Sequence, residues 1–104
     1  VPTSANQEDF VPMATWAARK AREIGENARS ILAIELLCGT QGVEFHHPLR
    51  TSPALQRVQA RVRKEVPKLL KDREIYEDIQ KMVELIRSGE IVKVAEEGVG
   101  EALA

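Results

Sequence analysis

A short polar run near the start of the chain carries the side chains best suited to chemistry. It offers amide donors, amide acceptors and two carboxylates on consecutive residues: Asn6, Gln7, Glu8 and Asp9. A long helical pattern follows, and the N-terminus of a helix has unpaired N–H groups and a positive partial charge that favour anions. A helix cap needs only one such residue. The run is therefore either a cap with more polar residues than capping requires or one wall of an active site.

Other reactive side chains form weaker patterns. His46 and His47 are the only histidines, and neighbouring histidines point in different directions, so we expect an exposed loop pair and no metal site. Cys38 is the only cysteine, which excludes an intramolecular disulfide and a cysteine-rich metal site. It stands in an apolar stretch without a nearby base, and we predict a buried, unreactive thiol.

A basic stretch could contact phosphates. Residues 57–73 hold seven Lys or Arg against two acids, whereas residues 74–104 hold eight acids against three bases. No aromatic residue stands within the basic stretch, and the net charge of the whole chain is −1. We therefore expect these bases to be solvated or paired within the molecule, and we expect neither nucleic acid nor a membrane as a partner.

The elements that position these side chains are predicted to be helices, in at most one domain of 104 residues. Only four residues are aromatic, so the core must use Ala, Ile, Leu and Val, which suits an all-α fold. No apolar run reaches the roughly 18 residues that a membrane span needs, and no signal-peptide pattern is present. These features favour a soluble, intracellular protein.

The helix boundaries follow from capping and breaking residues. Asp9 is suited to cap the first helix, and Pro12 is tolerated in its first turn. Gly42 can end that helix, Ser52 and Pro53 begin the next, and Pro67 and Ser88-Gly89 mark later ends. We predict one long helix at about 10–41, two shorter helices at about 53–66 and 74–87, and a short extended piece with a tail at 90–104.

The long helix has two unlike halves. Small residues recur at helical spacing in its first half, where they would let another helix approach closely: Ala14, Ala17, Ala18, Ala21, Gly25 and Ala28. Its second half, "ILAIELLCG", is apolar on nearly every side, with Glu35 as its only charge. Such a helix must be surrounded by other helices, and this chain has too few. The sequence therefore predicts a piece of a larger assembly or an oligomer.

Three phrases, "SANQED", "ILAIELL" and "LRTSP", in this order and spacing, resemble the C-terminal region of the aromatic amino-acid lyase and aminomutase family. The resemblance covers roughly residues 2–92. It implies a helical-bundle lyase fold, a cytoplasmic homotetramer, and the electrophile 4-methylidene-imidazol-5-one (MIO), which the family makes from an internal Ala-Ser-Gly. It also implies elimination of ammonia from an amino acid, with the branch that converts L-histidine to urocanate matching best.

The resemblance also assigns residues. Glu8 matches the family's active-site glutamate, expected to orient substrate or handle protons, and Gln7 and Asn6 fall at neighbouring pocket positions. Phe10 departs from the histidine branch, so tyrosine or phenylalanine lyases and aminomutases remain alternatives, although the phenylalanine branch typically carries Gln in place of Glu8. Because Ala-Ser-Gly does not occur in the chain, we expect a C-terminal segment that is inactive alone. The remaining alternative is a non-catalytic helical oligomerisation module.

Overall fold

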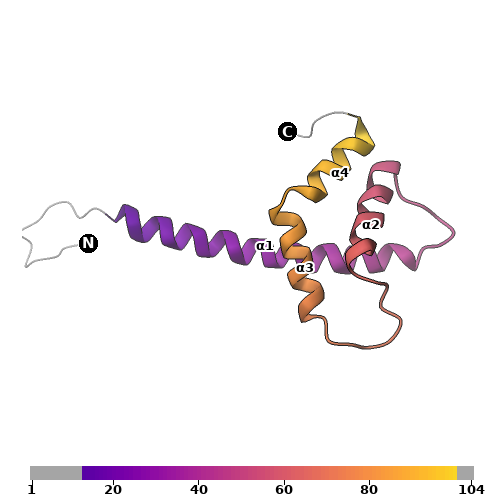
Figure 1. The fold of residues 1–104 in the computed structure, drawn as a ribbon, viewed down its shortest axis with the longest axis horizontal. Coiled ribbons are helices and arrows are strands. Elements are labelled where there is room, and N and C mark those ends of the chain that lie inside the picture. The colour runs from indigo at the N-terminus through magenta and orange to yellow at the C-terminus, as the bar shows by residue number, and fades with distance from the viewer. Residues whose placement is uncertain (1–12, 101–104) are drawn as a thin grey trace, which may run out of the picture.

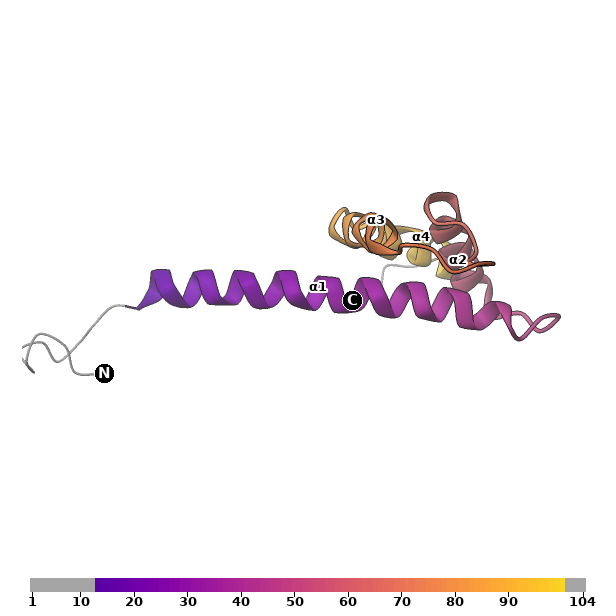
Figure 2. The same cartoon turned by 90° about the horizontal axis from the view of Figure 1, so that it is seen from below.

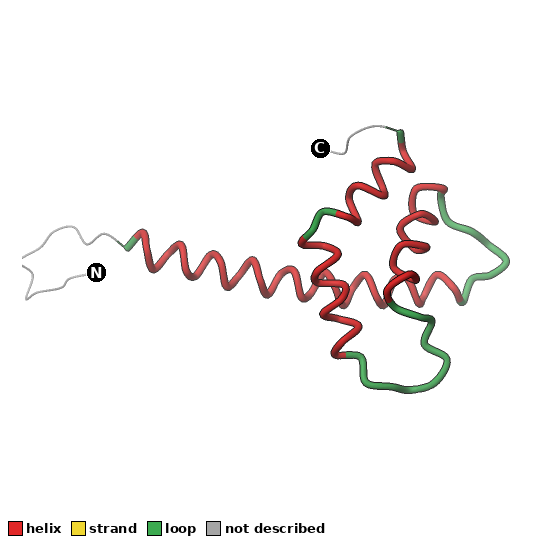
Figure 3. Tube along the Cα trace, viewed as in Figure 1, coloured by secondary structure: helices red, strands yellow, loops and turns green. Residues whose placement is uncertain are grey.

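The computed structural model describes residues 13–100, which contain four helices and, within that range, no strand (Figures 1 and 3). The helices are α1 (Ala14–Glu44), α2 (Pro53–Glu65), α3 (Tyr76–Arg87) and α4 (Glu90–Val99). The predicted all-α class, a long helix followed by shorter ones, is confirmed. None of these helices combines the length and the apolar character needed to cross a bilayer.

The shorter helices gather on one side of α1, over its C-terminal half. Figure 2 shows α2, α3 and α4 along one side, while the N-terminal half of α1 extends beyond them. The radius of gyration is 20.0 Å, compared with about 13 Å for a compact domain of this length. The fold is therefore open, with a long helix largely uncovered.

The helices pack in an interleaved order. α1 contacts mainly α3, and α2 contacts mainly α4. The buried apolar cluster is small. It consists of Ala33 from α1, Val62 from α2, Val66 just after α2, and Met82 and Leu85 from α3. Four of these five side chains come from α2, from the residue that follows it and from α3, so these helices supply most of the core.

Capping residues explain where α2 begins and ends. The Ser52 side chain accepts a hydrogen bond from the backbone N–H of Leu55 at 3.4 Å, and Pro53 occupies the first helical position. Val66 is extended because it precedes Pro67. The helix therefore ends at Glu65, one residue before the predicted end.

α3 and α4 are separated by two residues, Ser88 and Gly89. α3 begins at Tyr76, two residues after its predicted start, and ends at the predicted Arg87. Its first turn holds Glu77 and Asp78, and Arg87 lies in its last turn, so both ends complement the helix dipole. Gly89 then has a φ of +80°, a conformation that favours glycine, and α4 starts directly after it.

Two predicted boundaries are wrong. The predicted extended piece after residue 90 is helix α4, because Ile91, Val94 and Ala95 form a partly buried face toward the rest of the chain that outweighs the strand preference of Ile and Val. The long helix does not stop at about 41 but continues through Gly42 to Glu44. The predicted cap Asp9 and first-turn Pro12 lie outside the described residues.

Candidate functional site

The side chains predicted to do chemistry stand just before α1 in the sequence. Asn6, Gln7 and Glu8 lie outside the described residues, so their roles stay predictions. The structure describes the helix that follows them. Its flanking residue, Met13, makes no side-chain capping hydrogen bond, and its first turn contains no acidic residue.

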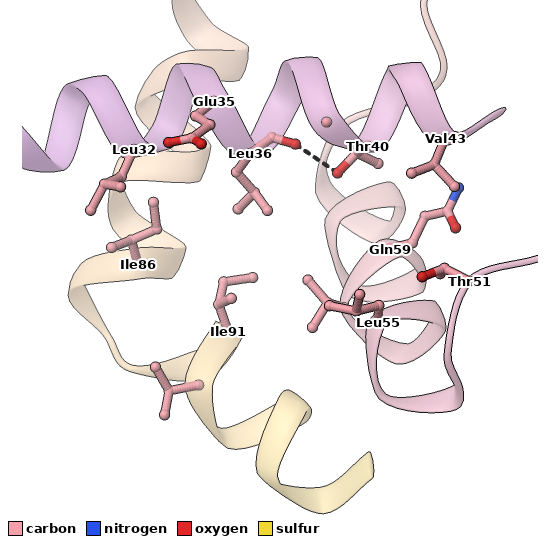
Figure 4. Close-up of a pocket in the computed structure, with 13 residues that line it drawn as sticks. Leu32, Glu35, Leu36, Thr40, Val43, Thr51, Leu55, Gln59, Ile86 and Ile91 are labelled. Atoms are coloured by element: carbon pink, nitrogen blue, oxygen red, sulfur yellow. Dashed lines mark hydrogen bonds between the residues drawn. The ribbon is translucent and has the colours of Figure 1, made fainter. Parts of the chain in front are cut away.

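An apolar groove of about 490 Å³ opens between the helices. Figure 4 shows Leu36 of α1, Leu55 of α2, Ile86 of α3 and Ile91 of α4 converging on it. Along α1 the groove extends from Leu32 to Val43, which is about three helical turns. All four helices therefore contribute side chains to it.

The groove has little polar chemistry. Glu35 is the only charged side chain that lines it, and this carboxylate has no hydrogen-bond or ion-pair partner among residues 13–100. The Thr40 hydroxyl is engaged, because its Oγ1 donates to the Leu36 carbonyl at 2.7 Å. One carboxylate in an apolar lining lacks the paired groups of general acid–base catalysis. The groove instead suits apolar side chains of another helix.

A polar network joins the end of α1 to α2 and to the segment 66–75 that follows α2. Nε of Arg63 donates to Oε1 of Glu44 at 2.6 Å, and Nζ of Lys68 lies 3.3 Å from Oε2 of the same carboxylate. Oε1 of Gln41 accepts from Nη2 of Arg63 at 3.0 Å and from the backbone N–H of Leu69 at 3.2 Å. The Glu44 side chain is only 10% exposed.

The charge on Glu44 is held in place by this network. Burial acts to raise the pKa of its carboxyl, but the hydrogen bonds from Arg63 and Lys68 and the attraction of both cations outweigh burial and lower the pKa. Glu44 is thus a paired anion at neutral pH and not a free base.

The basic stretch 57–73 is largely paired within the molecule. Arg61 binds Glu65 at 3.0 Å and Glu90 at 3.3 Å, and Nη2 of Arg73 lies 3.1 Å from Asp78. The hydrogen bond to Glu65 is the largest effect on the pKa of Arg61 and, with the bond to Glu90, raises it against burial. With Arg63 and Lys68, four of the seven bases bind acids, so the predicted intramolecular pairing is confirmed for these four.

The remaining reactive side chains do not form a site. His46 and His47 are both exposed in the connector after α1. Within residues 13–100, no three His, Cys, Asp or Glu side chains gather closely enough to hold a metal ion. Cys38 is exposed, and the prediction of a buried thiol is wrong for this chain, because α2, α3 and α4 cover only one side of α1.

Sequence reasoning missed the groove and the Glu44 network. Glu44 and Arg63 are 19 residues apart, so no helical spacing links them. The groove depends on α4, which the sequence did not predict. The one available signal was Glu35, a lone charge in an apolar stretch, and it does mark the edge of the groove.

Comparison with known proteins places the chain in a family. Residues 1–64 match the model of the aromatic amino acid lyase family. The chain is 48% identical over 96 residues to a histidine ammonia-lyase of Symbiobacterium thermophilum, covering 92% of this chain, and 43% identical over 101 residues to that of Natranaerobius thermophilus, covering 97%.

The helices also superpose on a solved structure. The crystal structure of histidine ammonia-lyase from Trypanosoma cruzi matches 94% of this chain with a TM-score of 0.84 and 41% identity. The chain spans about one fifth of the length of these relatives: 19% and 20% of the two bacterial proteins and 19% of the solved chain. From the family model, the identities and the shared helical fold, we conclude that the chain belongs to the aromatic amino acid lyase family.

Proposed function

We propose that the chain is part of a histidine ammonia-lyase, which eliminates ammonia from L-histidine to give urocanate. In that reaction the bond between Cα and the amino nitrogen breaks, a proton leaves Cβ, and a Cα–Cβ double bond forms. The observation that carries the proposal is the 43–48% identity to histidine ammonia-lyases along nearly the whole chain. The one-fifth coverage supports a segment of a longer polypeptide.

The family's electrophile, MIO, would come from another segment of that polypeptide. MIO supplies an electron-poor centre that activates the substrate for loss of ammonia. The residues of this chain do not provide it, because no Ala-Ser-Gly is present; the nearest phrase, Arg87-Ser88-Gly89, lacks the alanine and ends a helix. We therefore propose that the isolated chain is inactive.

The chain's own chemical contribution would be Glu8, with Gln7 and Asn6 beside it. A carboxylate at this position can orient a positively charged group of the substrate or accept a proton. The two amides can donate and accept hydrogen bonds and so fix the orientation of a polar substrate. These roles rest on the match between "SANQED" and the family motif.

The helices would hold the assembly together. Many large apolar side chains of α1 are exposed in the single chain, among them Trp16, Ile24 and Ile31. Contiguous exposed apolar surface marks interaction sites. We propose that the rest of the lyase polypeptide and further copies cover this surface, in the cytoplasmic homotetramer that the family resemblance implies.

The test is activity of the polypeptide extended upstream to include the electrophile, assayed by ultraviolet absorbance on L-histidine, L-tyrosine and L-phenylalanine. We expect urocanate from L-histidine alone. Turnover of an aromatic substrate would instead move the protein to a tyrosine or phenylalanine lyase or an aminomutase. If no substrate reacted despite an intact electrophile, the non-catalytic oligomerisation module would replace the enzyme, a role that the exposed apolar face of α1 favours.

A further inference from the structure

A second pocket, of about 310 Å³, lies between α2 and the connector 45–52 that precedes it. Thr51 and Gln59 line both this pocket and the apolar groove, and Figure 4 shows them beside Val43 at one end of the groove. The two hollows therefore adjoin each other, but their linings differ in kind.

The charged side chains of the second pocket are basic. Arg50, Arg63 and His47 line it, and no carboxylate of residues 13–100 does. The Arg50 side chain is exposed and has no ion-pair or hydrogen-bond partner in the same range. Because arginine stays protonated at any ordinary pH, the pocket carries one full positive charge that no described side chain balances.

Arg63 also has donors left for a ligand. Its Nε and Nη2 donate to Glu44 and Gln41, and its Nη1 donates to the Val66 carbonyl at 3.3 Å. A guanidinium has five N–H groups, and these three bonds use three of them. Glu44 is shared with Lys68, so one carboxylate faces two cations and the group keeps a net charge of +1.

Hydrogen bonds of the connector hold this lining in place. The backbone N–H of Leu49 donates to the carbonyl of His46 at 2.9 Å and closes a turn. Nε2 of Gln56 donates to the carbonyl of Thr51 at 2.7 Å and ties the end of the connector to α2. Arg50 lies between these two contacts in the sequence, so its backbone is held on both sides while its side chain stays available.

The donors of the pocket match a phosphate group. The Thr51 hydroxyl and the Gln59 amide add to the two guanidiniums, and a phosphate offers up to two negative charges and at least three strong acceptor oxygens. Four oxygens the size of water occupy roughly 120 Å³. The rest of the pocket has room for a small organic group, beside the apolar Val43, Leu49 and Ala60.

We propose that this pocket binds a phosphate group, either as free phosphate or as part of a small phosphomonoester. Arg50 supplies the unbalanced charge, and Arg63 supplies its remaining donors from the opposite wall. The proposal goes beyond the lyase reaction and does not depend on which amino acid the enzyme uses.

Calorimetric titration of the upstream-extended polypeptide, at constant ionic strength, tests the site with inorganic phosphate and with phenyl phosphate. We expect binding of both, weakened by Arg50→Gln by roughly tenfold to hundredfold, because a charged hydrogen-bonding partner is lost. Arg50→Lys keeps the charge but not the paired donors of a guanidinium, so it should weaken binding less. The unfolding midpoint should not change in either variant, because the Arg50 side chain binds no other described residue.

Arg57→Gln is the matched control. Arg57 is exposed on the same helix and lies outside the pocket, about 100° around α2 from Gln56. Its loss removes the same charge and should change the affinity less than about threefold, because exposed charges at a distance are screened. Equal losses of affinity in Arg50→Gln and Arg57→Gln, or no binding of either phosphate compound, would overturn the proposal.

The choice of compounds separates the possible sources of the phosphate group. Tighter binding of phenyl phosphate than of inorganic phosphate would assign a phosphomonoester, and equal affinity would assign free phosphate. Benzoate carries the same ring on a carboxylate, and we expect it to bind more weakly than phenyl phosphate. Benzoate that binds as tightly as phenyl phosphate would show that the pocket does not recognise phosphate.

Discussion

Arg63 and Glu44 join α2 to the last residue of α1 through a 2.6 Å hydrogen bond between Nε and Oε1. The carboxylate is 10% exposed and the guanidinium side chain 20% exposed. Two further residues belong to this network: Lys68, after α2, pairs with Glu44, and Gln41 of α1 accepts a hydrogen bond from Arg63. This contact therefore helps to hold α2 against the C-terminal end of α1 after residues 45–52 have connected the two helices.

Arg63→Met should lower the free energy of unfolding by about 1.5–3 kcal/mol, because it leaves a mostly buried carboxylate with one cation instead of two. Chemical denaturation would measure the change. Arg22→Met is the matched control: Arg22 pairs with Glu26 at 3.5 Å, but both side chains are largely exposed, so its loss should cost less than about 0.5 kcal/mol. Similar losses in both variants would show that burial of the Glu44 pair contributes nothing.

The same network predicts a pH dependence. Folding lowers the pKa of Glu44 from its ordinary value of 4.5, so the unfolded chain binds the proton more readily. The contribution of Glu44 to stability is therefore fully present above that value and lost as pH falls through the folded-state pKa. The stability advantage over Glu44→Gln should shrink as the pH drops below about 4.5. An advantage that is constant from pH 7 to pH 3 would contradict the role of the charge.

Gly98→Ala should displace α4 from α2. An added Cβ would lie 2.6 Å from Cα of Ala54 and 3.1 Å from Cδ of Arg57, and the backbone of a helix cannot yield by that amount. We expect a loss of about 1–3 kcal/mol in unfolding free energy and faster amide exchange in α4.

Gly42→Ala is the control for that change. Gly42 also lies in a helix, but an added Cβ there meets no atom within 4 Å. This substitution should stabilise the chain by about 0.5–1 kcal/mol, because alanine favours the helix. If both alanines had the same effect, the close approach of α4 to α2 would not be a feature of the folded chain.

Glu8→Gln in the upstream-extended enzyme should lower turnover by roughly 10²–10⁴-fold if the carboxylate handles a proton, with an unchanged unfolding midpoint. Asp9→Ala should instead affect stability and not turnover. If Asp9 caps the helix, its loss should lower the free energy of unfolding by about 1 kcal/mol. Urocanate absorbance and thermal unfolding would measure both. A Glu8 variant that loses folding and activity together would instead mark Glu8 as the capping residue.

Local chemistry made parts of the fold predictable. Ser52, Pro53 and Pro67 bound α2 to within one residue, because capping and proline geometry act through neighbouring atoms. α4 was not predictable in this way, since its partly buried face packs mainly against α2, a helix distant in the sequence.

The same distinction between local and long-range interactions applies to the residues of the candidate site. Glu8 was found through a motif that resembles a family, and it stays a prediction because it lies outside the described residues. The pairing of Glu44 with Arg63 could not be predicted, because two residues 19 apart meet only after the connector has turned the chain. Glu35 was singled out correctly as an anomaly, while its position at the edge of a groove required all four helices.

The interleaved packing of α1 with α3 and of α2 with α4 has a consequence for how the chain acquires its structure. No helix finds its main partner in the next helix along the chain, so each of the two largest interfaces requires a long loop to close first. During synthesis the apolar side of α2 stays uncovered until α4 has left the ribosome. A break anywhere in the connector 67–75 would leave the two sides of each of these interfaces on different pieces of the chain.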